Sequence, residues 1–221
     1  MASETFGSIK NLFLFFNMNK FRTLFEMIVI RFSRFLPRSW FWSMRARGID
    51  ASYGRETDDY PALKSVIESI RAKKIIDIGC GTARLFPVYV ETGATEIVGQ
   101  DVSTWALKES ARKFPQPICS FTHLPIEKLS YPEHHFDLCV TSRVLSAVPA
   151  SNLPQVLRSL TRMTKYLYLN EFSPSDAGQP SPYWFRHDYF TILSQICSYT
   201  IVKTGMIHRQ TYYLLRIESS K

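Results

Sequence analysis

The chain has 221 residues, of which 45% are hydrophobic, so it is long enough to bury one large core and to carry an extension besides. Its four cysteines stand singly, without the close pairs of a zinc site or the density of a disulfide scaffold, which indicates a reducing compartment; no metal site is predicted. The formal net charge of +8 is concentrated in residues 1–50, where eight lysines and arginines face three acidic residues.

Residues 1–52 are predicted to form a basic, aromatic and amphipathic helical arm. Apolar residues recur at spacings of three and four between positions 21 and 36, which predicts one helix that ends before Pro37. Charged residues interrupt this stretch, so no membrane span of about 20 residues fits. The arm could dock on the domain, close over its site or lie on an anionic membrane surface, whereas its apolar stripe makes nucleic acid the weaker partner. The expected location is cytoplasmic, with membrane association left open.

Residues 53–221 are predicted to form one domain in which helical and extended patterns alternate. Helices are predicted at 60–71, 82–92, 103–113, 151–163 and 185–196, and strands at 74–78, 96–102, 118–122, 136–141 and 166–172. This alternation favours a parallel sheet with helices on both faces. Two further strand patterns, at 198–203 and 210–217, are joined by a connection too short for a parallel crossover. The sequence therefore predicts a doubly wound, mostly parallel α/β sheet that ends in an antiparallel hairpin.

A glycine-rich turn after the first predicted strand carries the strongest functional signal. Gly79 and Gly81 follow the apolar run at 75–78 and allow a tight turn that brings backbone N–H groups close to a ligand. Asp101 follows Gly81 by 20 residues, at the end of the second strand, where a carboxylate can accept both ribose hydroxyls. The pattern therefore predicts a nucleoside-cofactor site.

A dinucleotide site would require a third glycine at the position where Arg84 stands. With Asp77 before the first glycine, the string instead resembles the Asp-x-Gly-x-Gly-x-Gly motif of class I S-adenosylmethionine (SAM) dependent methyltransferases, except that Ala83 replaces the last glycine. The terminal hairpin also resembles the seven-stranded sheet of that family. The resemblance covers roughly residues 53–217 and implies that SAM is the cofactor.

The resemblance assigns roles to the residues around the glycine turn. It implies that the backbone of residues 79–81, including Cys80, holds the methionine part of SAM and that Asp77 orients its ammonium group. It also implies that Asp101 binds the ribose hydroxyls, with Val102 beside it in the cofactor site. The aspartates could instead cap a turn and a helix, and Cys80 could be a small buried filler.

The third strand departs from the family pattern at its end. The family usually has an acid there that binds the adenine amino group, whereas Thr122 and His123 stand at this position. We expect Leu124 and Ile126 to sandwich the adenine ring while a backbone N–H group contacts its edge.

The fourth strand is followed by another stretch that resembles the family. Residues 136–148 are similar to its Phe-Asp-x-Val stretch and Val-Leu-x-His continuation, which implies that Ser142 and Val144 form a wall of the cofactor site. The same residues could only pack the sheet edge. Ser146 stands where a histidine is common, so no general base is evident there.

Two residues, one at the end of the fifth strand and one after it, are candidates for catalysis. Glu171 is predicted at the carboxyl end of that strand, where open α/β folds bind ligands. His187 lies in an aromatic cluster after a loop at 173–182, and an imidazole of ordinary pKa can act as a general base. A histidine beside aromatic residues is more often structural, so that alternative stays open.

The expected function is methyl transfer from SAM to a small or partly apolar, lipid-like molecule. Residues 141–144 lack the Asn/Asp-Pro-Pro-Tyr/Phe motif, which argues against adenine and glutamine-amide methylases. The alternatives are a protein or RNA methyltransferase and a catalytically silent subunit that serves as an interaction module. A NAD(P)-dependent oxidoreductase is disfavoured by Arg84 and by the terminal hairpin.

Overall fold

The structure is a computed structural model that describes residues 38–53, 57–172, 185–207 and 210–220. The helix predicted at 21–36 and the loop predicted at 173–182 lie outside the described residues. None of the described helices combines the length and the apolar character that crossing a membrane requires.

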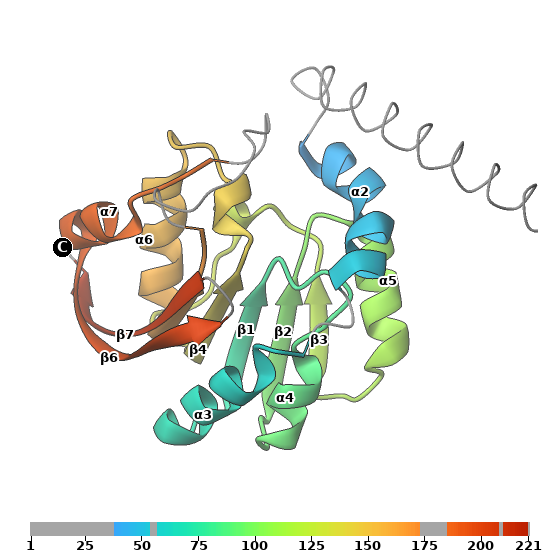
Figure 1. Ribbon diagram of the computed structural model, residues 1–221, viewed down its shortest axis with the longest axis horizontal. Helices are drawn as coiled ribbons and strands as arrows, with labels where there is room; N and C mark the ends of the chain where they lie inside the picture. Colours follow the sequence, from blue (N-terminus) through green and yellow to red (C-terminus); the bar gives the residue numbers. More distant parts are fainter. Residues whose placement is uncertain (1–37, 54–56, 173–184, 208–209, 221) are drawn as a thin grey trace, which may run out of the picture.

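The described strands form one seven-stranded sheet in the order β3-β2-β1-β4-β5-β7-β6 (Figure 1). The first five strands pair in parallel, and β7 is antiparallel to both of its neighbours. The strands are Lys74–Ile78 (β1), Glu96–Gln100 (β2), Cys119–Thr122 (β3), Phe136–Ser142 (β4), Thr164–Asn170 (β5), Cys197–Ile207 (β6) and Gln210–Ser220 (β7). The prediction of a doubly wound, mostly parallel sheet with a terminal antiparallel hairpin is confirmed.

Helices pack on both faces of this sheet. The α-helices are Arg38–Tyr53 (α2), Tyr60–Ile70 (α3), Phe86–Glu91 (α4), Thr104–Lys113 (α5), Leu153–Met163 (α6) and Tyr189–Ile196 (α7), and short 3₁₀ turns occur at Ile126–Lys128 (η2) and Leu145–Ala147 (η3). Helix α2 contains residues 52 and 53, so it continues through the predicted boundary between arm and domain. It packs against α5 near the carboxyl ends of β1, β2 and β3 (Figure 1).

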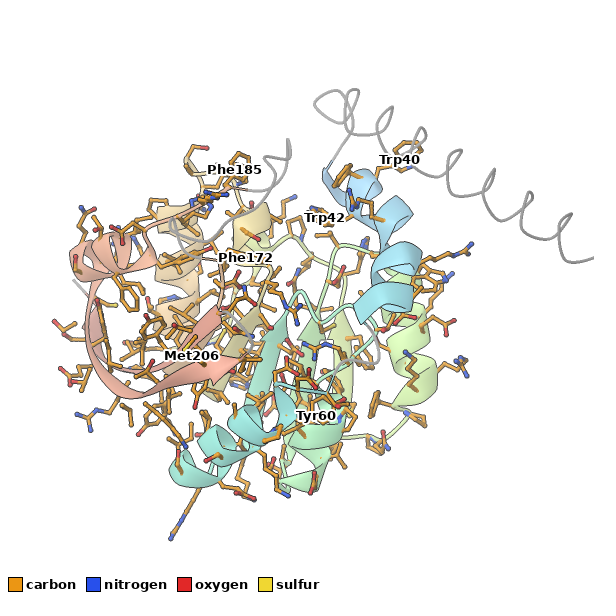
Figure 2. The ribbon with its side chains drawn as sticks, viewed as in Figure 1. Trp40, Trp42, Tyr60, Phe172, Phe185 and Met206 are labelled. Atoms are coloured by element: carbon orange, nitrogen blue, oxygen red, sulfur yellow. The ribbon has the colours of Figure 1, made fainter. Side chains whose placement is uncertain are left out.

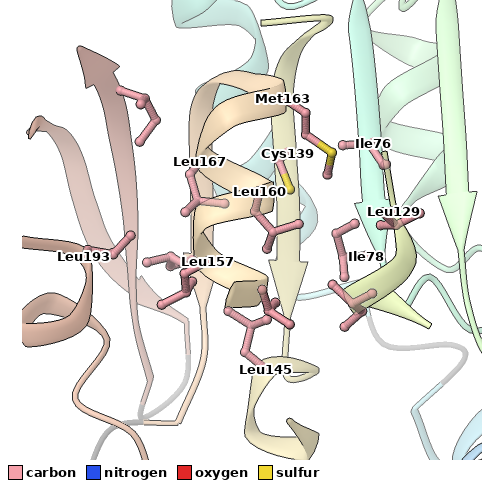
Figure 3. Close-up of a cluster of buried hydrophobic side chains, with 14 of the residues drawn as sticks. Ile76, Ile78, Leu129, Cys139, Leu145, Leu157, Leu160, Met163, Leu167 and Leu193 are labelled. Atoms are coloured by element: carbon pink, nitrogen blue, oxygen red, sulfur yellow. The ribbon is translucent and has the colours of Figure 1, made fainter. Parts of the chain in front are cut away.

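Successive residues of β1 point to opposite faces of the sheet, which creates two apolar cores. Ile76 and Ile78 pack with α6 and α7 in one core, part of which is shown in Figure 3. Ile75 packs with α3, α4 and α5 in the other core. Strands buried on both faces have continuous apolar runs, and the one polar residue inside the run of β1 is the buried Asp77.

Several element boundaries differ from the prediction for local reasons. Helix α4 begins at Phe86 rather than at residue 82, because Ala83 has a left-handed backbone conformation that an α-helix cannot contain. Strand β6 continues to Ile207, since its residues pair with β7 along most of the connection predicted at 204–209. The predicted cap of α5 is confirmed: the Ser103 hydroxyl accepts a hydrogen bond from the amide of Ala106, at 3.2 Å.

Candidate functional site

A cleft of about 270 Å³ opens at the carboxyl ends of β1, β2 and β4. Its walls are the turn after β1, the start of α5, the turn after β4 and one side of α2. The carboxyl edge of a parallel sheet is where open α/β folds bind ligands, because the strand order reverses there. The cleft contains most of the residues that the sequence singled out, and each is described in turn.

The glycine turn forms the floor of the cleft with two left-handed residues. Gly79 has a φ of +65° and Gly81 a φ of +56°. A Cβ atom on Gly79 would lie 2.3 Å from Cγ2 of Val144, whereas a Cβ on Gly81 would meet no atom within 4 Å. Because Gly79 has no side chain, Val144 can pack against it. At Gly81, the missing side chain leaves space open to the cleft.

Cys80 and Ala83, two further residues of the turn, have different environments. The Cys80 side chain is buried, and burial raises the pKa of its thiol well above the ordinary value, so the thiol is protonated and unreactive. Ala83 is also buried and has a φ of +61°, a left-handed conformation that costs a residue with a Cβ about 1–2 kcal/mol. The missing third glycine of the motif is thus compatible with the fold but leaves local strain.

Asp101 also lines the cleft, where its side chain contacts the glycine turn. Its carboxylate accepts hydrogen bonds from the amide of Gly81 at 3.0 Å and from the amide of Ser103 at 2.8 Å. Burial raises the pKa of Asp101, and these N–H groups oppose that change. A carboxylate has about four acceptor positions, so the two bonds leave capacity for a ligand.

Asp77 lies at the inner end of the cleft and is almost fully buried. Burial raises the pKa of its carboxyl to about 7, against the lowering influence of Tyr89 and Arg84. Its Oδ2 atom is buried without a hydrogen-bond partner. A buried carboxylate oxygen that lacks a partner costs stability, so this atom is suited to a polar group of a ligand.

Arg84 stands where a dinucleotide site would need its third glycine, and it also borders the cleft. Its guanidinium forms two hydrogen bonds, at 2.6 and 2.7 Å, with the carboxylate of Asp59, which is buried just before α3. The hydroxyl of Tyr60 donates a hydrogen bond to the Arg84 carbonyl. The arginine therefore joins the end of the turn to α3.

The remaining predicted cofactor residues divide into two groups. Val102, Ser142 and Val144 line the cleft. Leu124 does not: its side chain is 40% exposed, and its carbonyl accepts a hydrogen bond from the amide group of Gln100. Of the two residues predicted to sandwich the adenine ring, Ile126 lines the cleft and Leu124 does not.

The two predicted catalytic residues lie behind the wall of the cleft and do not line it. Oε1 of the buried Glu171 accepts a hydrogen bond from the Val144 amide at 3.1 Å. Nε2 of the buried His187 donates to the Val148 carbonyl at 2.9 Å, and burial lowers the imidazole pKa. Both side chains are thus engaged with the backbone of residues 144–148, and the geometry gives neither one access to a bound molecule.

Helix α2 supplies cleft residues that the sequence analysis did not name. Trp42, Ala46 and Asp50 line the cleft, and their spacing of four residues, which puts side chains on one helical face, was the signal available. Asp50 accepts a hydrogen bond from the Thr82 hydroxyl, and Lys113 lies 3.7 Å from its carboxylate.

Further aromatic contacts hold α2 in place. The guanidinium of Arg47 lies 5.4 Å from the centre of the Trp105 ring on α5. Within α2, the buried Phe41 packs edge-on against Trp42, with ring centres 5.1 Å apart, which orients the Trp42 ring. The end of the cleft near β4 and β5 is completed by Arg143, residues 147–148 and Phe172.

Within the described residues no cluster of three or more His, Cys, Asp or Glu side chains could hold a metal ion.

Comparisons with known proteins agree with this geometry. Residues 75–166 match a family described as a methyltransferase domain. An uncharacterized protein of Haemophilus influenzae is 35% identical over 112 residues, which are 48% of this chain and 43% of that protein. The chain therefore matches less than half the length of this curated relative.

Solved structures resemble the fold at low sequence identity. Phosphoethanolamine N-methyltransferase 1 from Haemonchus contortus has a TM-score of 0.67 and 14% identity, covering 83% of this chain and 50% of its own. The 1,6-didemethyltoxoflavin-N1-methyltransferase of Burkholderia thailandensis has a TM-score of 0.65 and 16% identity, covering 82% and 87%. Magnesium protoporphyrin IX methyltransferase from Synechocystis, crystallised with SAM, has a TM-score of 0.56 and 19% identity, covering 73% and 80%.

Proposed function

We propose that the chain is a class I SAM-dependent methyltransferase, which transfers the methyl group of SAM to a small, partly apolar acceptor. One observation carries the proposal: the glycine turn, Asp77 and Asp101 border a single cleft, and α2 closes one side of that cleft. These groups come from the ends of neighbouring strands and from a segment distant in sequence. The fold therefore brings together what a nucleoside-containing cofactor requires.

The residues of the cleft fit SAM by their chemistry. The space over Gly81 admits a ligand to the backbone, and Asp101 retains acceptor capacity for ribose hydroxyls. The unpartnered Oδ2 of Asp77 can accept a hydrogen bond from the ammonium group. When bound, SAM supplies a methyl group on a positively charged sulfur, which is already a strong electrophile.

The protein's contribution is then to position the acceptor and to exclude water. Alignment of two reactants can lower a barrier by about 7–11 kcal/mol without acid–base chemistry. Helix α2 is held over the cleft by the contacts of Asp50 with Thr82 and Lys113, which limits access of solvent. This assignment requires no general base in the cleft, in agreement with the positions of Glu171 and His187.

The acceptor end of the cleft is mainly apolar. Trp42 of α2 and Phe172 after β5 contribute aromatic rings, as Figure 2 shows, and residues 144, 147 and 148 contribute aliphatic side chains. Arg143 adds a positive charge to this lining. An acceptor of modest size with an apolar body fits such walls. The similar structures include a phosphoethanolamine and a 1,6-didemethyltoxoflavin methyltransferase, which supports an acceptor of small size.

A lipid-like acceptor and a membrane surface for the arm belong to the same proposal. Residues 1–37 directly precede α2 in the sequence, so an amphipathic segment of theirs on an anionic surface would come directly before the helix that borders the acceptor site. The protein would then be a cytoplasmic enzyme with a peripheral membrane contact. Sedimentation with anionic liposomes tests this part, and binding should weaken as salt rises. Equal sedimentation at all salt concentrations, or none, would refute the electrostatic contact.

Isothermal titration calorimetry tests the cofactor. We expect micromolar binding of SAM and S-adenosylhomocysteine and no binding of NAD. Asp101→Ala should weaken SAM by roughly 1.5–3 kcal/mol, the scale of hydrogen bonds to a charged group. Glu109→Ala, which removes a partly exposed carboxylate of α5 that pairs with Arg112 and does not line the cleft, is the control and should leave affinity unchanged. Binding of NAD without SAM would refute the assignment.

Transfer to fractionated extracts with methyl-labelled SAM tests the acceptor. Label in the small-molecule fraction supports the proposal, whereas label in protein or RNA, or SAM binding without transfer, supports one of the alternatives. Trp42→Leu should then raise the KM for the acceptor several-fold. Trp40→Leu on the same helix is the matched control, since the Trp40 side chain is 53% exposed and does not line the cleft.

A further inference from the structure

The segment of residues 144–148 is a wall of the cleft that is held from behind by polar side chains. Val144, residue 147 and Val148 face the cleft. The segment contains only the short turn η3, so its own hydrogen bonds fix little of its position. Its place in the fold depends on the burial of Leu145 and Val148 in the core and on polar contacts from β5 and from the residues before α7.

Glu171 makes the principal contact from behind. Its Oε1 accepts the Val144 amide at 3.1 Å, and the amides of residues 145 and 146 also act on the carboxylate. The side chain is buried, and burial raises its pKa to about 7. The titratable side chain that faces it from α7 is Tyr189. Burial of a carboxyl costs more free energy than burial of an apolar side chain, unless N–H groups form hydrogen bonds with it.

The segment in turn contacts the glycine turn. The side chain of Val144 occupies the space beside Gly79, where a Cβ would lie 2.3 Å from Cγ2 of Val144. Both residues line the cleft. A displacement of the Val144 backbone would therefore change the floor on which the methionine part of the cofactor is proposed to lie.

We propose that Glu171 is a positioning residue of the SAM site, which holds Val144 against Gly79 through the backbone of the 144–146 turn. This inference rests on the proposed function, because it concerns the binding of SAM. It assigns to Glu171 a role that needs no contact with the acceptor or with the reacting atoms. The carboxylate acts on the cofactor site through two other residues.

SAM affinity measured by calorimetry, well below the melting temperature, is the test. Glu171→Ala should weaken SAM at least tenfold, and Glu171→Gln, which keeps an oxygen for the Val144 amide, should restore affinity to within threefold of the unsubstituted protein. Asp188→Ala is the control for general destabilisation, because it removes the cap of α7 without touching the 144–146 turn. It should lower the melting temperature but not the SAM affinity.

A double-mutant cycle shows whether Glu171 acts through Val144. In a Val144→Ala background, Glu171→Ala should cost less than a further threefold, because the side chain that transmits the effect is gone. Additive losses would overturn the proposal, as would Glu171→Ala binding SAM within twofold of the unsubstituted protein. If the unsubstituted protein binds no SAM, the proposed function and this inference fail together.

The unsubstituted protein supplies a measurement if Glu171→Ala does not fold. The amide NMR signal of Val144 should titrate with a midpoint near the pKa of about 7 of Glu171, and Glu171→Gln should abolish that titration. A Val144 amide that does not respond at any pH at which the protein stays folded would overturn the contact on which the proposal depends.

Discussion

Replacing each glycine of the turn by alanine should have different consequences, because the two positions share a backbone conformation but not an environment. Both have positive φ, so each substitution costs about 1–2 kcal/mol of backbone strain. At Gly79 the new Cβ would also collide with Val144, and overpacking of this kind adds roughly 1–3 kcal/mol. Gly79→Ala should therefore lower the free energy of unfolding by about 2–5 kcal/mol, and Gly81→Ala by about 1–2 kcal/mol.

Urea denaturation followed by circular dichroism measures both free energies. Val144→Ala in the Gly79→Ala background should recover part of this roughly 1–3 kcal/mol, because it removes the Cγ2 methyl group at 2.3 Å and leaves the Val144 Cβ at 2.8 Å. For SAM affinity, the two substitutions should rank in the opposite order. The new Cβ of Gly81→Ala lies in the open cleft, so this substitution should lower SAM affinity strongly although it costs little stability. Equal destabilisation by the two alanines, together with no coupling to Val144, would refute this account of the turn.

Two further substitutions test the strain and the charge of the same site. Ala83→Gly should raise the free energy of unfolding by about 1 kcal/mol, because glycine adopts the φ of +61° without a Cβ penalty; a decrease would show that the buried methyl group contributes more than the strain. Asp77 has a pKa of about 7 in the fold against 3.8 unperturbed, so between pH 4 and 7 the unfolded chain ionises while the folded one keeps its proton. Through Asp77, stability should therefore fall as pH rises through this range, by at most about 4 kcal/mol, and the fall should be smaller by this contribution in Asp77→Asn, where Glu171, whose pKa is also raised to about 7, still acts. SAM affinity should rise over pH 5.5–8, since the ionised carboxylate suits the ammonium group, and calorimetry that shows no pH dependence would exclude Asp77 from that role.

The sheet could be predicted from sequence because its strands are strongly periodic and its connections have diagnostic lengths. The apolar run of β1 and the terminal hairpin indicated the topology without reference to any distant contact. The start of α4 could not be predicted, because the left-handed conformation of Ala83 depends on how the whole turn is packed. Residue type alone had suggested that the helix continued through it.

The candidate site was predictable where function depends on the backbone and on strand ends. The turn and Asp101 follow from local sequence, whereas the contribution of Trp42 and Asp50 depends on tertiary contacts of α2. Glu171 and His187 were predicted as candidate catalytic residues from their positions at and after the end of the fifth strand, but sequence does not reveal in which direction a side chain points. Their contacts with the 144–148 backbone arise from the packing of β5 and of the segment before α7.

The place of β7 within the sheet has a consequence for synthesis on the ribosome. This strand comes last among the described elements but lies between β5 and β6, where Leu214 and Leu215 are fully buried. Until residues 210–220 have been made, the edge of β5 has no partner, and a nascent chain exposes unpaired backbone groups there. Completion of the sheet must therefore follow translation of its final strand, and ribosome stalling before residue 210 should yield chains that recruit chaperones or aggregate.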